Sequence, residues 1–159
     1  MPGVRVPVRV LKPLANFKEE DTVLLPEEAV KVLWSYGLVE VVDEMDRMVS
    51  EVDRVLTEEK ENEPLSELPK GLYERAEFWM WYAENYIRQH PEDTKAITVT
   101  LAKLANLKKK VRDLRTLRLN KILKAAMLRP HSDTILSRLS PEEAEVYEYL
   151  SDFIERWLE

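Results

Sequence analysis

The sequence predicts an α+β protein in which a small N-terminal β-rich B domain (residues 1–42) precedes a larger all-α helical-bundle A domain (residues 43–159). Two observations lead to this prediction. The stretch VRVPVRVL alternates apolar and basic residues with the period of a strand, whereas apolar residues after Asp43 recur at steps of three and four. A chain of 159 residues can hold one full domain and a small satellite.

The N-terminal unit reads as strand, loop, strand, helix and strand. Pro7 confines the first strand to an edge or a bulge, because proline cannot donate a hydrogen bond to the ladder. Gly37 is a natural stop for the helix. A unit of about 40 residues rarely stands alone, so we expect it to lean on the helices. The expected bounds are Val4–Leu11, Thr22–Leu25, Pro26–Tyr36 and Leu38–Val42.

The remainder of the chain reads as four helices. The third, if unbroken from Pro91 to Leu128, would be roughly 55 Å long and would overhang a fold of this size. The fourth opens at Ser140-Pro141-Glu142-Glu143, which has the pattern of a capping box. The expected helices are Asp43–Asn62, about Gly71–His90, about Pro91–Leu128 and one from Ser140 to the C-terminal end.

The segment FWMWYA, Phe78 to Ala83, makes the second helix apolar on two sides. On a helical wheel Phe78, Trp81 and Tyr82 lie opposite the other apolar residues, which fill a sector of about 120°. Two apolar faces need two partners. The core-facing set is Leu72, Ala76, Trp79, Met80, Ala83, Tyr86 and Ile87.

The second stripe has two possible partners. A neighbouring helix or the small β-rich unit of the same chain is one. We predict the other, a second subunit, because aromatic side chains dominate well-packed interfaces and large exposed apolar patches are rare on monomers. The predicted interface residues are Phe78, Trp81, Tyr82, Leu101, Leu104, Val111 and Trp157.

The segment Leu107–Lys124 carries a charge of +7, while the rest of the chain carries −13. Such asymmetry is typical of nucleic-acid-binding proteins, and a module that binds nucleic acid through Lys108–Lys124 is the alternative function. However, the cations surround the helix and no aromatic residue is interleaved for stacking on bases. We expect acidic helices to neutralise the segment, with its arginines partly buried in ion pairs. The candidates for charge pairing or weak DNA contact are Lys108, Lys109, Arg112, Arg115 and Arg118, and candidate acids are Glu51, Glu58, Glu59, Glu142, Glu143 and Glu145.

No catalytic or metal-binding motif is apparent. The absence of cysteine excludes disulfides and thiolate metal sites. His90 and His131 have no second ligand at metal spacing and read as turn residues, and adjacent His131-Ser132-Asp133 cannot form a catalytic relay. Three isolated glycines cannot build a phosphate-binding loop. We predict no catalytic residue, no metal, no cofactor and no enzymatic activity.

No window approaches the roughly 18 apolar residues of a membrane span, and the N-terminus lacks a continuous apolar block. We therefore expect no membrane partner and a cytoplasmic protein.

The order of these segments is similar to that of a known family. VRVLKP and TVLLPEEAVKVLWSYGLVEVVD precede LRTLRLNKILKAA and LSPEEAEVYEYLSDFIERWL. From about Val4 to Leu158 this arrangement resembles the archaeal GINS subunits of the DNA replication apparatus. The B domain comes before the A domain, as in the subunit type related to the second and third eukaryotic members.

The resemblance implies a non-catalytic scaffold. It implies a 2:2 tetramer with a second GINS subunit type, in which long helices pack together. It also implies association with the MCM replicative helicase and a RecJ-like protein at chromosomal replication forks.

Overall fold

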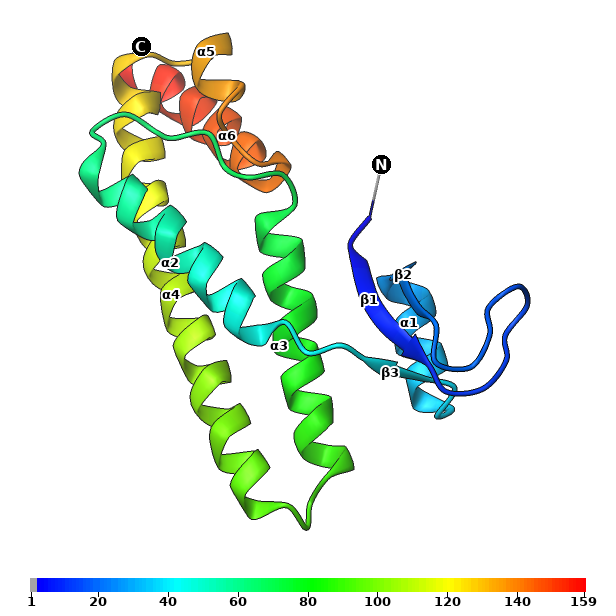
Figure 1. The fold of residues 1–159 in the computed structure, drawn as a ribbon. Coiled ribbons are helices and arrows are strands. Elements are labelled where there is room, and N and C mark those ends of the chain that lie inside the picture. Colours follow the sequence, from blue (N-terminus) through cyan, green and yellow to red (C-terminus); the bar gives the residue numbers. More distant parts are fainter. Residues whose placement is uncertain (1–2) are drawn as a thin grey trace.

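The computed structural model describes residues 3–159, so the first two residues of the predicted 1–42 unit lie outside the described residues. A three-stranded antiparallel sheet with one helix precedes a larger helical bundle, which confirms the predicted α+β class (Figure 1). The elements are β1 (Arg5–Val10), β2 (Thr22–Pro26), α1 (Glu27–Ser35), β3 (Val39–Val41), α2 (Met45–Glu61), α3 (Leu72–Gln89), α4 (Thr94–Leu128), α5 (Asp133–Leu136) and α6 (Pro141–Leu158).

The sheet has the order β2-β1-β3, so β1 is its central strand. The prediction that Pro7 confines this strand to an edge or a bulge is wrong, and the short β3 ladder explains why. The carbonyl of Pro7 accepts a hydrogen bond from the Val42 N–H at 2.9 Å. The missing N–H of Pro7 faces the same side, where the ladder begins only at Val8↔Val41. Pro7 therefore costs only the reciprocal bond to Val42, at the open end of this ladder.

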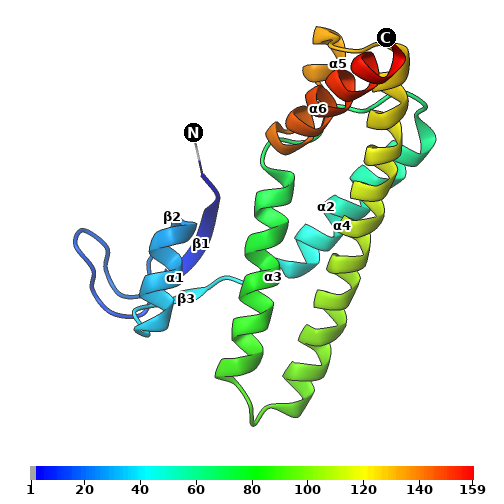
Figure 2. The same ribbon diagram turned by 180° about the vertical axis from the view of Figure 1, so that it is seen from behind.

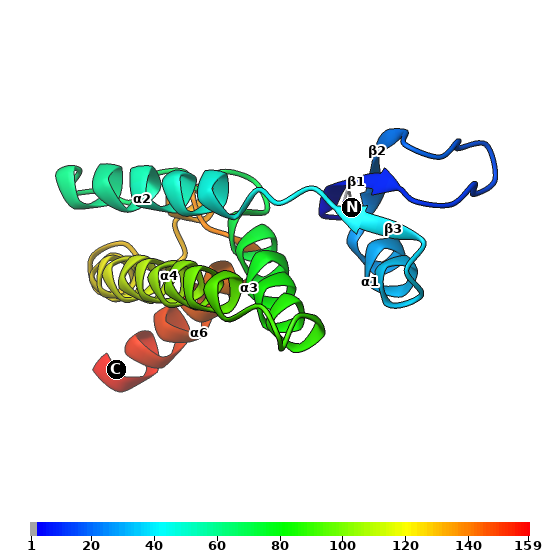
Figure 3. The same cartoon turned by 60° about the horizontal axis from the view of Figure 1, so that its bottom comes forward.

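The N-terminal sheet unit packs against the helical bundle beside α3 (Figures 1 and 3). Val6, Val8 and Val10 alternate with outward-facing residues and are buried. Val6 and Val8 belong to the same hydrophobic cluster as residues of α2, α3 and α4. The small unit thus shares its core with the bundle, as its size requires.

The long helix α4 organises the bundle. Its 35 residues run without a break, so it is about 52 Å long, close to the length predicted. It contacts α2, α3 and α6, and α6 crosses its C-terminal half (Figures 1 and 2). A second, smaller hydrophobic cluster around Ile122 and Tyr147 joins α4 to α6.

Local signals explain how α6 and α5 begin. The predicted capping box is present: the Ser140 hydroxyl accepts from the Glu143 N–H at 3.3 Å, and the Glu143 carboxylate accepts from the Ser140 N–H at 3.0 Å. Ser132 caps the short helix α5, which sequence periodicity cannot detect in four residues. Within residues 3–159, no helix is both long enough and apolar enough to cross a membrane.

Candidate subunit interface

The second apolar stripe of α3 is covered by the N-terminal unit of the same chain. Phe78 is 1% exposed and Tyr82 is 5% exposed, while Trp81 is half-buried. The Trp34 ring from α1 stacks on Tyr82 with centroids 5.2 Å apart and meets Trp81 edge-on at 5.5 Å. The ammonium of Lys31 lies 5.0 Å from the centroid of the Trp81 ring. The expectation that a second subunit covers this stripe is therefore corrected: the small β-rich unit does so.

The other predicted interface residues divide into two groups. Leu104 and Val111 lie in the main hydrophobic cluster, so they are also corrected as interface residues. Helical spacing places them on the same inner side of α4 as Leu107 and Leu114. Leu101 and Trp157 are exposed, Trp157 to 78%, and remain predictions.

A buried ion-pair network surrounds Arg118, which is fully buried. Its Nε donates to Glu143 at 2.7 Å and its Nη1 donates to Glu59. The other three N–H groups donate to the Ser66 carbonyl, the Arg138 carbonyl and the second Glu143 oxygen. All five guanidinium donors are thus engaged. Burial alone would lower the pKa of Arg118, but the hydrogen bonds and charges of Glu143 and Glu59 raise it above its ordinary value.

Lys121 extends this network to the end of α2. Its ammonium donates to the Glu59 carboxylate at 2.6 Å and to the Asn62 carbonyl at 2.6 Å. Two cations therefore meet two carboxylates where α2, α4 and α6 converge. No side-chain nitrogen or oxygen buried in residues 3–159 lacks a hydrogen-bond partner. The network joins three helices without leaving an uncompensated charge.

Ion pairs also engage other cations of the basic segment. Lys108 pairs with Glu84 at 3.1 Å and Lys110 with Asp53 at 2.5 Å. Arg115 pairs with Glu142 at 3.2 Å and lies 4.0 Å from the centroid of the Tyr73 ring. By contrast, Lys109, Arg112 and Lys124 are exposed and form no ion pair with any described residue.

Exposed apolar side chains gather on the C-terminal half of α4 and on α6. We call this set the α4–α6 apolar surface. The rings of Phe153 and Trp157 stack with centroids 6.2 Å apart, and both are exposed. Single exposed apolar residues are ordinary, but a group on two adjoining helices is typical of a binding surface. We define the surface by Leu119, Leu123, Val146, Phe153 and Trp157; the same two helices also expose Met127, Leu128, Tyr149 and Leu158.

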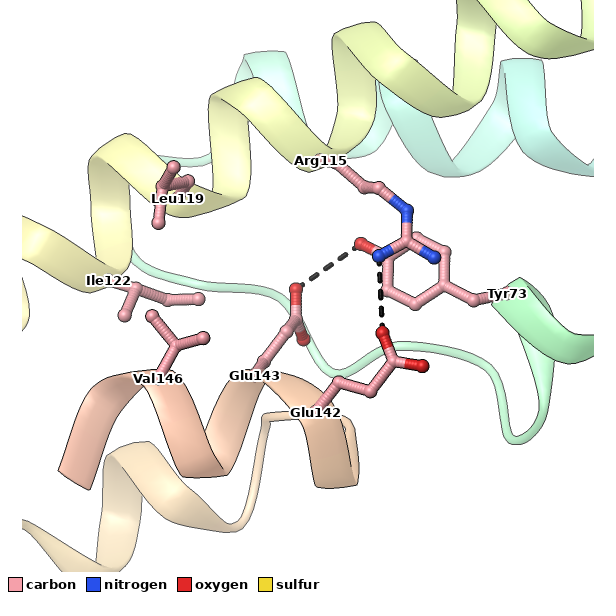
Figure 4. A pocket seen from close by; sticks show the side chains of 7 residues that line it. All are labelled: Tyr73, Arg115, Leu119, Ile122, Glu142, Glu143 and Val146. Atoms are coloured by element: carbon pink, nitrogen blue, oxygen red, sulfur yellow. Dashed lines mark hydrogen bonds and ion pairs between the residues drawn. The ribbon is translucent and has the colours of Figure 1, made fainter. Parts of the chain in front are cut away.

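A pocket of about 180 Å³ opens between α4 and α6 (Figure 4). Leu119, Ile122 and Val146 form an apolar wall, and Figure 4 places Tyr73, Arg115, Glu142 and Glu143 around the other side. The Tyr73 hydroxyl donates to Glu143 at 3.2 Å, and burial raises the pKa of Tyr73, so this hydroxyl stays protonated. The pocket can accept an apolar side chain beside a charged rim. Nothing in the sequence pattern distinguished Tyr73, because its partners are distant in the chain.

One cluster has donor atoms that could hold a cation. Ligand atoms of His131, Asp152 and Glu155 lie within 4.8 Å of one another, and all three residues are exposed. His131 also forms an ion pair with Glu148 at 2.6 Å, which raises the pKa of the imidazole. The three carboxylates around the ring favour the protonated form of the imidazole, and such contacts account for this geometry. The spacing of His131 in the sequence could not reveal partners that α6 supplies.

Comparison with known protein families matches residues 48–159 to the family described as Sld5, GINS complex protein helical bundle domain. The match begins in α2 and includes α3, α4, α5 and α6, which carry the ion-pair network and the α4–α6 apolar surface. No curated protein matches the chain. The matched region is most of the chain, so this protein belongs to the GINS family of structural subunits of a DNA replication complex.

Proposed function

We propose that this chain is a non-catalytic structural subunit that assembles with a second GINS subunit type into a 2:2 tetramer and supports the replicative MCM helicase. The α4–α6 apolar surface carries the proposal, because it lies within the family's helical bundle domain and is exposed in the single chain. An MCM helicase and a RecJ-like protein are the further partners in this proposal, and the site of action is the replication fork.

The exposed aromatic rings give a measure of the driving force. Phe153 is 47% exposed and Trp157 is 78% exposed. Large aromatic side chains bury about 150–250 Å² each, so covering these two rings contributes on the order of 5 kcal/mol to association. A permanent interface of about 2,000 Å² or more would extend over the neighbouring apolar residues.

The state of the basic segment favours a structural role over nucleic-acid binding. Arg118 is buried among acidic side chains, and Lys108, Lys110 and Arg115 pair with acids of the same chain. A phosphate backbone needs free cations along a continuous track. The remaining exposed cations are too few for such a track.

Co-expression with the second GINS subunit of the same organism tests the proposal. Native mass spectrometry should give a 2:2 particle, and the double variant Phe153→Ser/Trp157→Ser should lose it. The matched control is Val32→Ser/Tyr36→Ser, which removes equally exposed apolar groups from α1 and its C-terminal end and should assemble normally.

Absence of any complex between the unmodified chains would overturn the proposed function. A normal 2:2 particle from the Phe153→Ser/Trp157→Ser variant would instead show that the α4–α6 apolar surface is not the subunit interface. The functional readout is DNA unwinding by the MCM helicase, which the intact complex should stimulate and the dissociated variant should not.

A further inference from the structure

A histidine and three carboxylates meet where the turn after α4 packs against α6, at one end of the bundle (Figures 1 and 2). The Nδ1 atom of His131 lies 2.6 Å from Glu148. Its Nε2 atom lies 3.1 Å from Asp152 and 3.5 Å from Glu155. The three acids are spaced by four and three residues, so they occupy one side of α6. One ring nitrogen therefore faces one carboxylate, and the other faces two.

Buried residues of α6 hold the backbone that carries His131. The His131 N–H donates to the Ser151 hydroxyl at 3.4 Å, and the Ser132 N–H donates to the Tyr147 hydroxyl at 2.9 Å. The Tyr147 hydroxyl in turn donates to the Arg129 carbonyl. Ser151 and Tyr147 are fully buried, so the core sets the position of the imidazole beside α6.

The imidazole leaves this cluster short of positive charge. Even when protonated, the ring supplies one charge against three carboxylates, and its Nε2 has one hydrogen for the two carboxylates that face it. No lysine or arginine among the described residues forms an ion pair with Glu148, Asp152 or Glu155. The Arg118 network differs, because two cations there meet two carboxylates. The cluster thus retains two negative charges for which the described part of the chain provides no cation.

The separations around Nε2 match the coordination of a divalent transition metal. Zinc binds imidazole nitrogen and carboxylate oxygen at about 2.0–2.2 Å in a tetrahedral arrangement, which separates neighbouring ligand atoms by about 3.3–3.6 Å. The two distances from Nε2, 3.1 and 3.5 Å, are close to this range, and all three ligand atoms lie within 4.8 Å of one another. Three protein ligands leave the fourth position to a water molecule.

Glu148 lies outside this set of three ligands and supplies a feature that metal-binding histidines share. In such sites the other ring N–H commonly donates to a carboxylate, which fixes the tautomer and orients the ring. An ionised carboxylate can only accept, so Nδ1 carries a hydrogen toward Glu148. In a neutral ring the lone pair is therefore on Nε2, which faces Asp152 and Glu155.

We propose that His131, Asp152 and Glu155 bind one divalent transition-metal ion, with zinc as the best fit. Glu148 orients the imidazole. The mixed nitrogen and oxygen ligand set favours zinc, cobalt or nickel over magnesium and calcium, which prefer oxygen ligands alone. The ion takes the place of the Nε2 proton and joins the turn between α4 and α5 to α6. Metal binding by the isolated chain does not depend on the proposed assembly.

Isothermal titration calorimetry of the full chain with zinc chloride tests the site. We expect one zinc ion per chain, and His131→Gln should weaken the affinity at least tenfold because it removes the nitrogen ligand. Glu148→Ala should weaken the affinity about tenfold, the usual effect of losing an outer partner of a metal-binding histidine. The matched control is His90→Gln, which removes the other histidine of the chain and should change the affinity less than twofold. His90 is exposed, and its Nδ1 lies beside the Tyr86 carbonyl.

Two further measurements separate a built site from general attraction of cations to an acidic surface. An excess of magnesium should leave zinc binding unchanged, since magnesium requires octahedral oxygen ligands. Zinc should raise the melting temperature of the unmodified chain but not that of His131→Gln, because an ion bound to the native state stabilises it. The metal site is overturned if the unmodified chain binds no zinc, if His131→Gln binds it equally well, if His90→Gln causes the same loss, or if magnesium displaces the zinc.

Discussion

The two aromatic clusters of this chain are alike in composition but differ in their surroundings. Trp81 and Tyr82 on α3 are covered by Trp34, which the N-terminal unit supplies. Phe153 and Trp157 on α6 stack on each other and remain exposed. An aromatic stripe alone therefore does not identify a subunit interface. What matters is whether another part of the same chain reaches it.

The same contrast holds for two arginines of α4. Arg118 is buried and its five donors are satisfied by the chain, whereas Arg112 is exposed with no acidic partner among the described residues. The arginine on the inward-facing side of α4 has all its partners within the chain, whereas the arginine on the outward-facing side has no acidic partner among the described residues. Substitutions on the two sides test this division.

Arg118→Met should lower the free energy of unfolding by about 3–5 kcal/mol, because it leaves Glu59 and Glu143 buried without their main partner. Urea denaturation followed by circular dichroism measures this loss. The matched control, Arg112→Met, should change stability by no more than about 0.5 kcal/mol. Equal effects of the two substitutions would contradict the division between inner and outer faces.

Trp34→Ala should lower the free energy of unfolding by about 2–3 kcal/mol, because it removes the ring that covers Trp81 and Tyr82. The loss is limited because the site is partly exposed and can relax. The same measurement on Trp157→Ala should show a change of at most about 0.5 kcal/mol in the isolated chain. A larger loss from Trp157→Ala than from Trp34→Ala would mean that the two clusters have been assigned the wrong roles.

Ser140→Ala should lower the free energy of unfolding by about 1 kcal/mol, because it removes the capping box of α6. Glu143 belongs both to this box and to the buried network, so the substitution also tests how far the cap positions that carboxylate. Thermal unfolding checks the effect, with Ser50→Ala on the exposed side of α2 as the control. An unchanged melting temperature for Ser140→Ala would show that the network alone holds the start of α6.

The smallest change in stability should come from His131→Gln. The hydrogen bond to Glu148 raises the pKa of His131. A raised folded-state pKa stabilises the protein fully below the unfolded value of about 6.5, and this contribution is lost as pH rises through the folded value. The difference in melting temperature between the unmodified chain and His131→Gln should therefore shrink from pH 6 to pH 8. A constant difference over this range would contradict the ion pair.

The sequence carries local information about this fold and little about its long-range partners. The capping box at Ser140 and the long uninterrupted helix were predictable, since each depends on residues close together in the chain. The prediction that Pro7 lies in an edge strand or a bulge was wrong because strand order depends on residues distant in the chain. The proline lies in the central strand, just beyond the β3 ladder.

The candidate site shows the same limit. The helical wheel correctly identifies a second apolar stripe on α3, but a wheel cannot show that Trp34 reaches it. It likewise cannot distinguish Arg118 from Arg112, because burial depends on where α2 and α6 lie. The carboxylates around His131 are 17 or more residues away in the chain, so no spacing rule finds them.

The buried network also determines the behaviour of the loop between α2 and α3. Lys121 holds the carbonyls of Asn62 and Pro64, Arg138 holds that of Leu65, and Arg118 holds that of Ser66. Three cations thus hold four backbone carbonyls of this loop in place. Its shape is preformed, so a protein that docks there meets a surface whose backbone entropy has already been lost during folding.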